Sequence, residues 1–282
     1  MTRTSPVPVG IALGTIGLEG GAWLRAAALL ATGPIDRLWI WDHLMGRGAP
    51  ERPVLEATTL AAAALALNPN LHVGTLVLDV TKRHPALTAK LAATLDAIAP
   101  GRFTLGIGAG GDAAEHDALG MHYGEVGERI AALTEQVAVA RAMLSGDPRE
   151  RVTPNGSESL MGAASAPRPG ARLRLLIAGD HPSSINLAAS SADEWVAPVA
   201  TFSDGLALLR ERERSAGRMQ PPVRTHLLYE LRAAETLAES PFGRDPQGVC
   251  ADAQAAGADG VIVTVRTERD AEVALQLLAK LR

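Results

Sequence analysis

Short apolar runs alternate with longer stretches rich in alanine and leucine along almost the whole chain. The short runs are typical of strands buried on both faces, whereas the longer stretches repeat their apolar positions with the period of a helix. The pattern predicts eight strands, at Val7–Leu13, Asp36–Trp41, Leu71–Leu78, Arg102–Ile107, Arg174–Ala178, Glu194–Ala197, Val223–Leu231 and Gly260–Val265. It predicts a helix after each strand, at Ala22–Ala31, Val54–Leu67, Ala86–Ile98, Glu128–Leu144, Ser183–Ser191, Asp204–Ala216, Gln247–Ala256 and Glu268–Leu281.

Strict alternation of strands and helices predicts a parallel sheet, because a helical crossover returns the chain to the same end of the sheet. Eight such units over 282 residues match a (β/α)8 barrel, for which about 250 residues is typical. An open, doubly wound sheet has the same local pattern, since periodicity does not show whether a sheet closes. The count of eight, without an obvious linker, favours one α/β barrel domain over residues 1–282.

One segment interrupts this alternation, between the fourth helix and the fifth strand. Ser145–Arg172 is rich in Gly, Pro, Ser and Arg, and it is long for a connection within a barrel. We expect it to be a short insertion that is partly mobile.

Composition narrows the classes of function. The formal net charge is −4 and the pI is about 6.0, so the chain lacks the basic surface that neutralises nucleic-acid phosphates. No apolar run is long enough for a signal peptide or a membrane span, which leads us to expect a cytoplasmic protein. The single cysteine, Cys250, excludes an intrachain disulfide and a thiolate zinc site, and its helical context favours a buried, inert thiol. His116 and His122 lack helical ligand spacing, and no metal site is predicted.

Reactive side chains gather where predicted strands end, and the carboxyl ends of barrel strands form the active site. Asp42 and His43 follow the second strand. A histidine exchanges a proton near neutral pH, and a neighbouring carboxylate can orient it or raise its basicity. The alternative is structural, with Asp42 capping a helix and His43 bonded to loop carbonyls.

The glycine-rich run from Gly106 to Gly111 follows the fourth strand and fits the GxGxxG pattern of dinucleotide-binding proteins. That motif also needs an acidic residue at the end of the next strand, about 20 residues further on. No strand is predicted before Arg174, so this requirement fails. We interpret the glycines as a place where something flat and bulky approaches the backbone at the barrel mouth.

The segment Gly179–Ser184, with the sequence GDHPSS, follows the fifth strand and opens a helix. Free N–H groups and serine hydroxyls at the start of a helix can bind a phosphate. Ordinary capping of the helix by Ser183 or Ser184 explains the same residues equally well.

Longer blocks of the sequence resemble a known family. The stretch RHPALTAKLAATLDAIAPGRFTLGIGAG, within Gly74–Leu144, is similar to a block of the bacterial luciferase-like superfamily of flavin and deazaflavin oxidoreductases. Asp42-His43 after a tryptophan-bearing strand, and IAGDHPSSINLAASSADEW, match two further blocks in the same order. The resemblance is closest to the branch that depends on coenzyme F420, which includes methylenetetrahydromethanopterin reductase, and it covers most of residues 7–200.

This resemblance implies a barrel enzyme that transfers a hydride between the deazaflavin C5 of F420 and a small organic substrate. His43 would lie over the reactive face of the ring as a proton donor or a stabiliser of charge, with Asp42 near the substrate. Leu76-Val77 falls where the family carries a non-prolyl cis peptide that supports the ring from behind. The other implied cofactor contacts are Gly108, Ala109, Gly110 and Gly111 at the ring edge, and Gly179, Asp180, His181, Ser183 and Ser184 at the phosphate. Family members are often dimers, so we expect a homodimer.

The chain also departs from the family pattern. Several F420 enzymes carry a glutamate as proton donor where Gly111 stands, which leaves the acid unassigned between Asp112 and Glu115. FMN in place of F420 would make the chain a monooxygenase on the same barrel. A non-catalytic cofactor carrier and a metal-dependent barrel hydrolase are the remaining alternatives.

Overall fold

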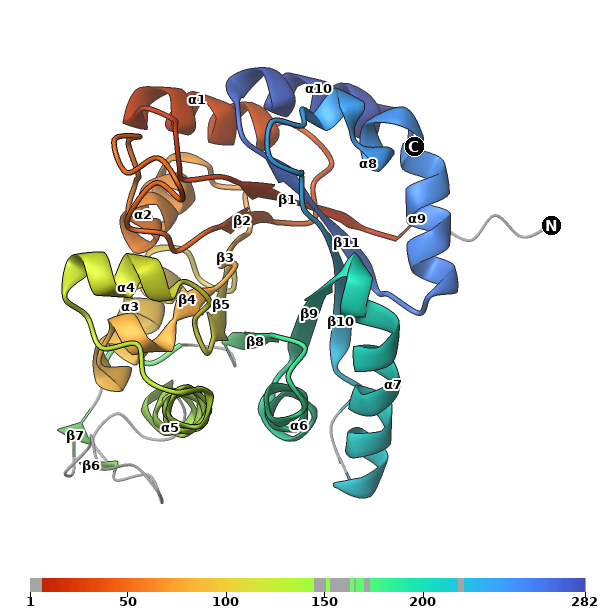
Figure 1. The fold of residues 1–282 in the computed structure, drawn as a ribbon. Coiled ribbons are helices and arrows are strands. Elements are labelled where there is room, and N and C mark those ends of the chain that lie inside the picture. The colour runs from red at the N-terminus through yellow and green to blue at the C-terminus, as the bar shows by residue number, and fades with distance from the viewer. Residues whose placement is uncertain are drawn as a thin grey trace.

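The strands of the molecule form a closed ring. The computed structural model describes residues 7–144, 151–152, 163–164, 166–169, 173–217 and 221–281. All strands of the main sheet pair in parallel, in the order β3-β2-β1-β11-β10-β9-β8-β5-β4, and a pairing of β3 with β5 closes the ring. Their bounds are β1 (Val9–Leu13), β2 (Leu38–Ile40), β3 (Val73–Thr75), β4 (Leu78–Asp79), β5 (Phe103–Gly108), β8 (Arg174–Ala178), β9 (Glu194–Pro198), β10 (Arg224–Tyr229) and β11 (Gly260–Val265). The predicted barrel is confirmed, and the open sheet is excluded (Figure 1).

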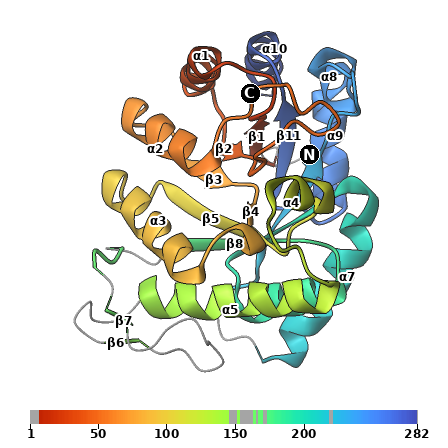
Figure 2. The same ribbon diagram turned by 60° about the vertical axis from the view of Figure 1, so that its left-hand side comes forward.

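Helices surround this ring and cover its outer face (Figures 1 and 2). Each of the eight predicted helices overlaps an observed one: α1 (Gly20–Leu30), α2 (Ala57–Leu67), α3 (Pro85–Ile98), α5 (Val126–Leu144), α6 (Pro182–Ser191), α7 (Val199–Ser215), α9 (Pro246–Ala255) and α10 (Glu268–Ala279). The pattern missed four short elements, η1 (Val80–Lys82), α4 (Ala113–Leu119), η2 (Leu237–Glu239) and α8 (Pro241–Arg244). These are too short to show a helical period in the sequence.

The predicted third strand is divided into β3 and β4. Gly74 lies opposite Thr104, whereas Leu78 lies opposite Ile107, so β3 and β4 contain one residue more than the facing part of β5. This is a β-bulge, and the Leu76–Val77 peptide inside it is cis, as the resemblance implies. Because both halves pair with β5, they occupy one position of the eight in the barrel.

The amino-terminal end of the barrel is filled by charged and aromatic side chains. Arg37 Nη1 donates to both carboxylate oxygens of Glu194, at 3.1 and 3.0 Å, and His226 Nε2 lies 2.7 Å from Glu194 Oε2. All three side chains are 2% exposed or less. Burial alone would raise the pKa of Glu194, but His226 and Arg37 hold it far below the usual range. The Arg37 guanidinium also lies 4.9 Å from the centroid of the Trp39 ring.

The Ser145–Arg172 insertion is described only in part. Within it, β6 (Arg151–Val152) and β7 (Ala163–Ala164) form an antiparallel pair outside the barrel. Lys90 donates to the Ala166 carbonyl, which joins this segment to α3. The expected mobility concerns residues that lie largely outside the described ranges.

Two further expectations concern the chain as a whole. Cys250 is buried, as expected, and burial raises the pKa of its thiol to about 11, which disfavours the reactive thiolate. Across the described ranges, no helix is both long and apolar enough to cross a bilayer.

Candidate active site

Two neighbouring cavities lie at the carboxyl ends of the strands. The first has a volume of about 500 Å³, and the second, of about 540 Å³, shares Trp41, His43, Arg47 and Leu76 with it. The first cavity is lined by all but one of the predicted site residues, namely Asp42, His43, Leu76, Val77, Gly108, Ala109, Gly110, Gly111, Gly179, Asp180, His181 and Ser184. Ser183 is the predicted residue that does not line it. His43 therefore lies on the wall between two cavities that are each large enough for a small ligand.

His43 has an incompletely satisfied ring. Its Nδ1 is buried without a hydrogen-bond partner in the described part of the chain, and it lies 3.8 Å from Glu115 Oε1. The ring contacts Trp41 edge-on, with 6.4 Å between centroids. Burial lowers the pKa of His43, and the Lys82 and Arg47 cations lower it further, against the opposing effect of Glu115. The lowered pKa favours the neutral imidazole of His43, which can accept a proton.

Glu115 fixes the loop that carries His43. Its Oε1 accepts from the backbone N–H groups of Leu44 at 2.6 Å and Met45 at 2.8 Å, and Lys82 donates to Oε2. Burial would raise the pKa of Glu115, but Lys82 and these N–H groups hold it below the usual range. A carboxylate kept ionised in this way is a poor proton donor, which argues against Glu115 as the unassigned acid.

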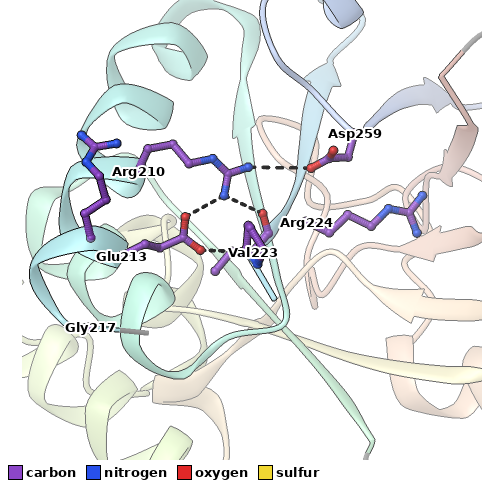
Figure 3. Close-up of a pocket in the computed structure, with 8 residues that line it drawn as sticks. Arg210, Glu213, Gly217, Val223, Arg224 and Asp259 are labelled. Atoms are coloured by element: carbon purple, nitrogen blue, oxygen red, sulfur yellow. Dashed lines mark hydrogen bonds and ion pairs between the residues drawn. The ribbon is translucent and has the colours of Figure 1, made fainter. Parts of the chain in front are cut away.

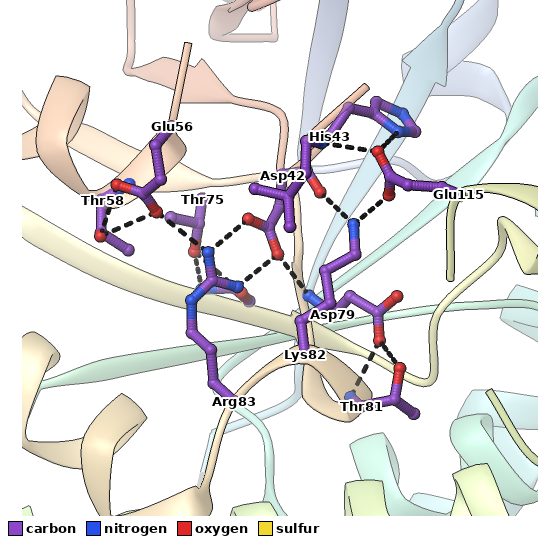
Figure 4. Close-up of polar contacts among 12 residues, drawn as sticks. Asp42, His43, Glu56, Thr58, Thr75, Asp79, Thr81, Lys82, Arg83 and Glu115 are labelled. Atoms are coloured by element: carbon purple, nitrogen blue, oxygen red, sulfur yellow. Dashed lines mark hydrogen bonds and ion pairs between the residues drawn. The ribbon is translucent and has the colours of Figure 1, made fainter. Parts of the chain in front are cut away.

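The Asp42 carboxylate is directed into the protein, where cationic and backbone donors surround it (Figure 4). Arg83 donates to it at 2.6 and 2.7 Å, and the Asp79 N–H donates at 2.9 Å. The side chain is only 1% exposed. The resemblance implies that Asp42 lies near the substrate; the residue lines the first cavity, and its carboxylate ties the end of β2 to Asp79 of β4 and to Arg83. Arg83 also donates to Glu56 at 2.9 Å.

Asp112 is the other candidate for the acid. It caps α4, because its Oδ1 accepts from the Glu115 N–H at 3.1 Å. Its second oxygen pairs with Arg47 at 3.3 Å. Both oxygens are thus engaged, which leaves the identity of the proton source open.

Three alternate glycines of the predicted run make room for the neighbouring bulge. An added Cβ would approach the Thr75 carbonyl at Gly106, would lie 2.7 Å from the Val77 side chain at Gly108, and would lie 2.7 Å from the Asp79 carboxylate at Gly110. Gly110 also has a φ of +81°, which favours glycine. We had interpreted the run as a place where a ligand approaches, yet these glycines are first required by protein atoms. Gly111 differs, because its Cβ would meet nothing within 4 Å.

The start of α6 is capped by an unexpected residue. His181 Nδ1 accepts from the Ser183 N–H at 3.2 Å, so the capping role that we considered for Ser183 and Ser184 belongs to His181. Ser184 is buried beside Gly179 and lines the first cavity. Gly179 has a φ of +127°, and its carbonyl accepts from Trp195 Nε1 at 3.0 Å.

A larger cavity, of about 820 Å³, lies at the opposite end of the barrel (Figure 3). Its charged side chains pair with one another, since Arg210 bonds Glu213 at 2.7 Å and lies 3.9 Å from Asp259. That pairing makes it a weaker candidate for chemistry than the His43 region. Among the residues that the structure describes, no group of three or more His, Cys, Asp or Glu side chains could hold a metal ion.

The sequence is similar to that of known oxidoreductases over most of its length. The sequence profile of the luciferase-like monooxygenase family matches residues 19–241. The chain belongs to this family. It is 34% identical over 163 residues to an F420-dependent glucose-6-phosphate dehydrogenase of Beutenbergia cavernae, a match that covers 57% of this chain and 46% of that protein. It is 29% identical to the enzyme of the same name from Kineococcus radiotolerans, over 73% of this chain and 62% of that protein. The chain thus spans about half to three fifths of the length of these relatives.

The fold has a close structural counterpart. An F420-dependent secondary alcohol dehydrogenase in complex with an F420–acetone adduct superposes with a TM-score of 0.80 at 18% identity, over 98% of this chain and 99% of that one. At this identity, the likeness supports the luciferase-like barrel fold alone.

Three further residues build the site beyond the predicted set. Lys82 joins Glu115 to the Asp42 carbonyl, Trp41 lines both cavities, and Asp79 faces Gly110. Trp41 and Asp79 stand at strand ends, where the sequence pattern already points to site residues. The contacts of Lys82 join residues that are more than 30 positions apart, and no local pattern announces them.

Proposed function

We propose that the protein is an F420-dependent oxidoreductase that transfers a hydride between deazaflavin C5 and a small organic substrate. The observation that carries this proposal is the position of His43, which lines two cavities while its buried Nδ1 lies beside Glu115. One cavity would hold the cofactor and the other the substrate, so His43 can reach both. The F420-dependent relatives support the choice of cofactor.

The first cavity fits a flat ring with a phosphate-bearing tail. Leu76 and Val77 provide an apolar wall, and Gly111 leaves open space beside it. Ser184 and the first turn of α6 would hold the phosphate through a hydroxyl and backbone N–H groups. When bound, the deazaflavin supplies the hydride chemistry, and the protein supplies position, polarity and a proton.

The second cavity is the proposed substrate site. It is lined by apolar residues and by Arg47, Arg52, Arg266 and Glu230. During oxidation of an alcohol group, the neutral His43 imidazole would accept the hydroxyl proton while the carbon loses its hydride. During reduction of a carbonyl, the same ring would return that proton. Glu115 would keep the ring oriented and stabilise its protonated form.

An FMN-dependent monooxygenase is the second candidate, because it could use the same cavities on the same barrel. The family profile that matches the chain is that of luciferase-like monooxygenases, which favours this alternative. A non-catalytic cofactor carrier would also need the first cavity but would not need His43.

Paired titrations of the purified protein with F420 and with FMN, followed by calorimetry, test the cofactor. Preferential binding of F420 is expected, and preferential binding of FMN would overturn the proposal. His43→Ala should then lower turnover by about 10²-fold or more, the scale of general acid–base assistance, with cofactor binding retained. His72→Ala is the control, because His72 is an exposed histidine just before β3, at the amino-terminal end of the barrel, and it does not line the first or the second cavity. Equal turnover of both variants would refute the role of His43, whereas F420 binding without any turnover would favour the carrier.

A further inference from the structure

We propose that Asp79, Thr81 and His116 form a proton relay in the wall of the cofactor cavity. These residues are called the relay below. The proposal rests on the proposed hydride transfer, which needs one proton to enter or leave the site in each turnover. It also addresses the acid that Gly111, Asp112 and Glu115 leave unassigned.

The three side chains form a continuous chain of short contacts. Thr81 Oγ1 lies 2.6 Å from Asp79 Oδ1 and 2.7 Å from His116 Nε2. His116 Nδ1 lies 2.8 Å from the carbonyl oxygen of Asp112. His116 is fully buried, and the Asp79 side chain is 9% exposed.

The three short contacts within the relay and to the Asp112 carbonyl need one hydrogen more than a neutral His116, an ionised Asp79 and the Thr81 hydroxyl supply together. A carbonyl oxygen only accepts, so His116 Nδ1 carries a hydrogen. Each of the two contacts of Thr81 is too short to lack a hydrogen, yet the hydroxyl has only one. The second hydrogen must therefore come from His116 Nε2 or from the Asp79 carboxyl group.

Whichever group carries it, the relay holds one proton beyond a neutral imidazole and an ionised carboxylate. A position on His116 also agrees with the ion-pair distance of 3.4 Å between its Nε2 and Asp79 Oδ2. A buried proton that three groups share in this way can move with little rearrangement of the protein.

The nearby charged groups already have partners of their own. Arg129 donates to the carbonyls of Ala109 and Gly124 and stacks on Tyr123, whose ring lies 4.9 Å from His116. Lys82 pairs with Glu115. Asp112 pairs with Arg47. The extra proton is therefore a property of the relay itself.

The relay also connects two spaces. Asp79 lines the proposed cofactor cavity, whereas Thr81 lines a separate cavity of about 330 Å³ together with Met121, His122 and Tyr123. The Thr81–Asp79 hydrogen bond thus joins the outer cavity to the inner one. A proton can pass through the hydroxyl while the wall between the cavities stays closed.

The proton balance of the reaction gives the relay its role. In carbonyl reduction, the substrate carbon receives a hydride with its electron pair from the reduced deazaflavin, and the substrate oxygen receives a proton from His43. The relay gives its stored proton to the cofactor cavity, directly or through water, to restore His43. Thr81 then refills the relay from the outer cavity. In alcohol oxidation, each proton moves in the opposite direction.

Nitrogen NMR of the histidine rings in the cofactor-free protein tests the stored proton without any turnover. At pH 8 a free imidazole is neutral, but we expect His116 to carry hydrogens on both nitrogens, or Asp79 to give the carbon shift of a protonated carboxyl group. Asp79→Asn should leave a neutral His116, because the substitution removes the carboxylate charge beside the ring. Asp96→Asn is the control, since Asp96 is also buried but accepts from Gly101 at the far end of α3. A neutral ring beside an ionised Asp79 in the wild type would overturn the proposal.

Turnover of the F420-loaded enzyme tests the relay in action. Thr81→Val removes the hydroxyl at nearly constant volume, and we expect turnover to fall by about 10²-fold with a changed pH profile. Thr81→Ser keeps the hydroxyl and should remain close to the wild type. Turnover of Thr81→Val equal to that of Thr81→Ser would refute the relay, whereas failure of the wild type to bind F420 would refute the proposed function instead.

Discussion

Both ends of the barrel hold a histidine beside a glutamate and a cation, but the hydrogen bonding and the exposure of the histidine differ. At the amino-terminal end, Arg37, Glu194 and His226 form a buried network in which the carboxylate is fully paired. At the carboxyl end, a histidine again lies beside a buried glutamate that a cation holds, but His43 Nδ1 has no hydrogen-bond partner among the described residues, and the residue lines two cavities. A buried polar group without a partner costs about 1–3 kcal/mol.

The surroundings of these two histidines distinguish a structural residue from a functional one better than the residue type does. His226 and His43 both lie beside a buried carboxylate, and composition cannot tell them apart. His226 completes a closed network, whereas the partly exposed His43 lines two cavities in which a ligand can contact its ring. A histidine that lines cavities at the mouth of a barrel is therefore a stronger indication of a site than the presence of a histidine alone.

The largest effect is expected where the closed network is broken. Arg37→Met leaves Glu194 buried without the guanidinium that donates to both of its oxygens, which should lower the free energy of unfolding by about 3–5 kcal/mol. Chemical denaturation measures this loss. Arg25→Met is the matched control, because Arg25 pairs with Glu268 on the surface at 68% exposure and should leave stability unchanged within error. Similar losses for the two variants would contradict the contrast between buried and exposed pairs.

The glycine run offers a matched pair within the site itself. Gly110→Ala places a methyl group against the Asp79 carboxylate at a φ of +81°, and we expect a destabilisation of about 1–3 kcal/mol. Gly111→Ala adds the same methyl group in open space and should have little effect on the melting temperature. A destabilised Gly111→Ala would show that the space beside it is needed by the protein and not by a ligand.

Charge removal at Glu115 should separate the two roles of that residue. Glu115→Gln keeps acceptors for the Leu44 and Met45 N–H groups but removes the negative charge beside His43. Because Glu115 raises the pKa of His43 against the larger effect of burial, the substitution should lower that pKa further. NMR titration of the His43 ring measures the change. An unchanged pKa would mean that Glu115 only holds the loop.

The smallest effect is a pH dependence of stability. The pKa of His43 is lowered in the folded state, so the unfolded chain binds more protons at a pH just below the ordinary histidine value of about 6.5. Stability should therefore fall as the pH decreases through that window, and His43→Ala should reduce the slope. Denaturation at a series of pH values from 5 to 7.5 gives the slope of each variant. A slope that is identical in both would indicate that His43 titrates normally.

The sequence predicted the repeating parts of this molecule and not its local exceptions. All eight barrel strands and eight helices could be predicted, because each buries an apolar face with a fixed period. The short helix α4 has no such period, yet it carries Glu115 and His116. The contact of Glu115 with the Leu44 N–H joins residues 71 positions apart, and only the closed barrel brings them together.

The site residues divide along the same line. His43 and the glycines were found because strand ends and glycine runs are visible in one dimension. The ion pair of Asp42 with Arg83 was not found, because the sequence does not show whether a carboxylate faces a cavity or a guanidinium group. The sequence also did not predict that His181 caps α6, because the general preference for N-cap residues favours the nearby serines over histidine.

Within the glycine run that lines the first cavity, alternate positions tolerate substitution to very different degrees. At Gly106, Gly108 and Gly110, the space that a Cβ atom would need is occupied by an atom of the neighbouring segment 75–79. A substitution at one of these glycines therefore requires a compensating change in segment 75–79. Ala109 and Gly111 lie between and beyond these fixed positions and also line the cavity. New specificities on this barrel would therefore arise at these two positions by single substitutions, and the bulge would be inherited as a unit.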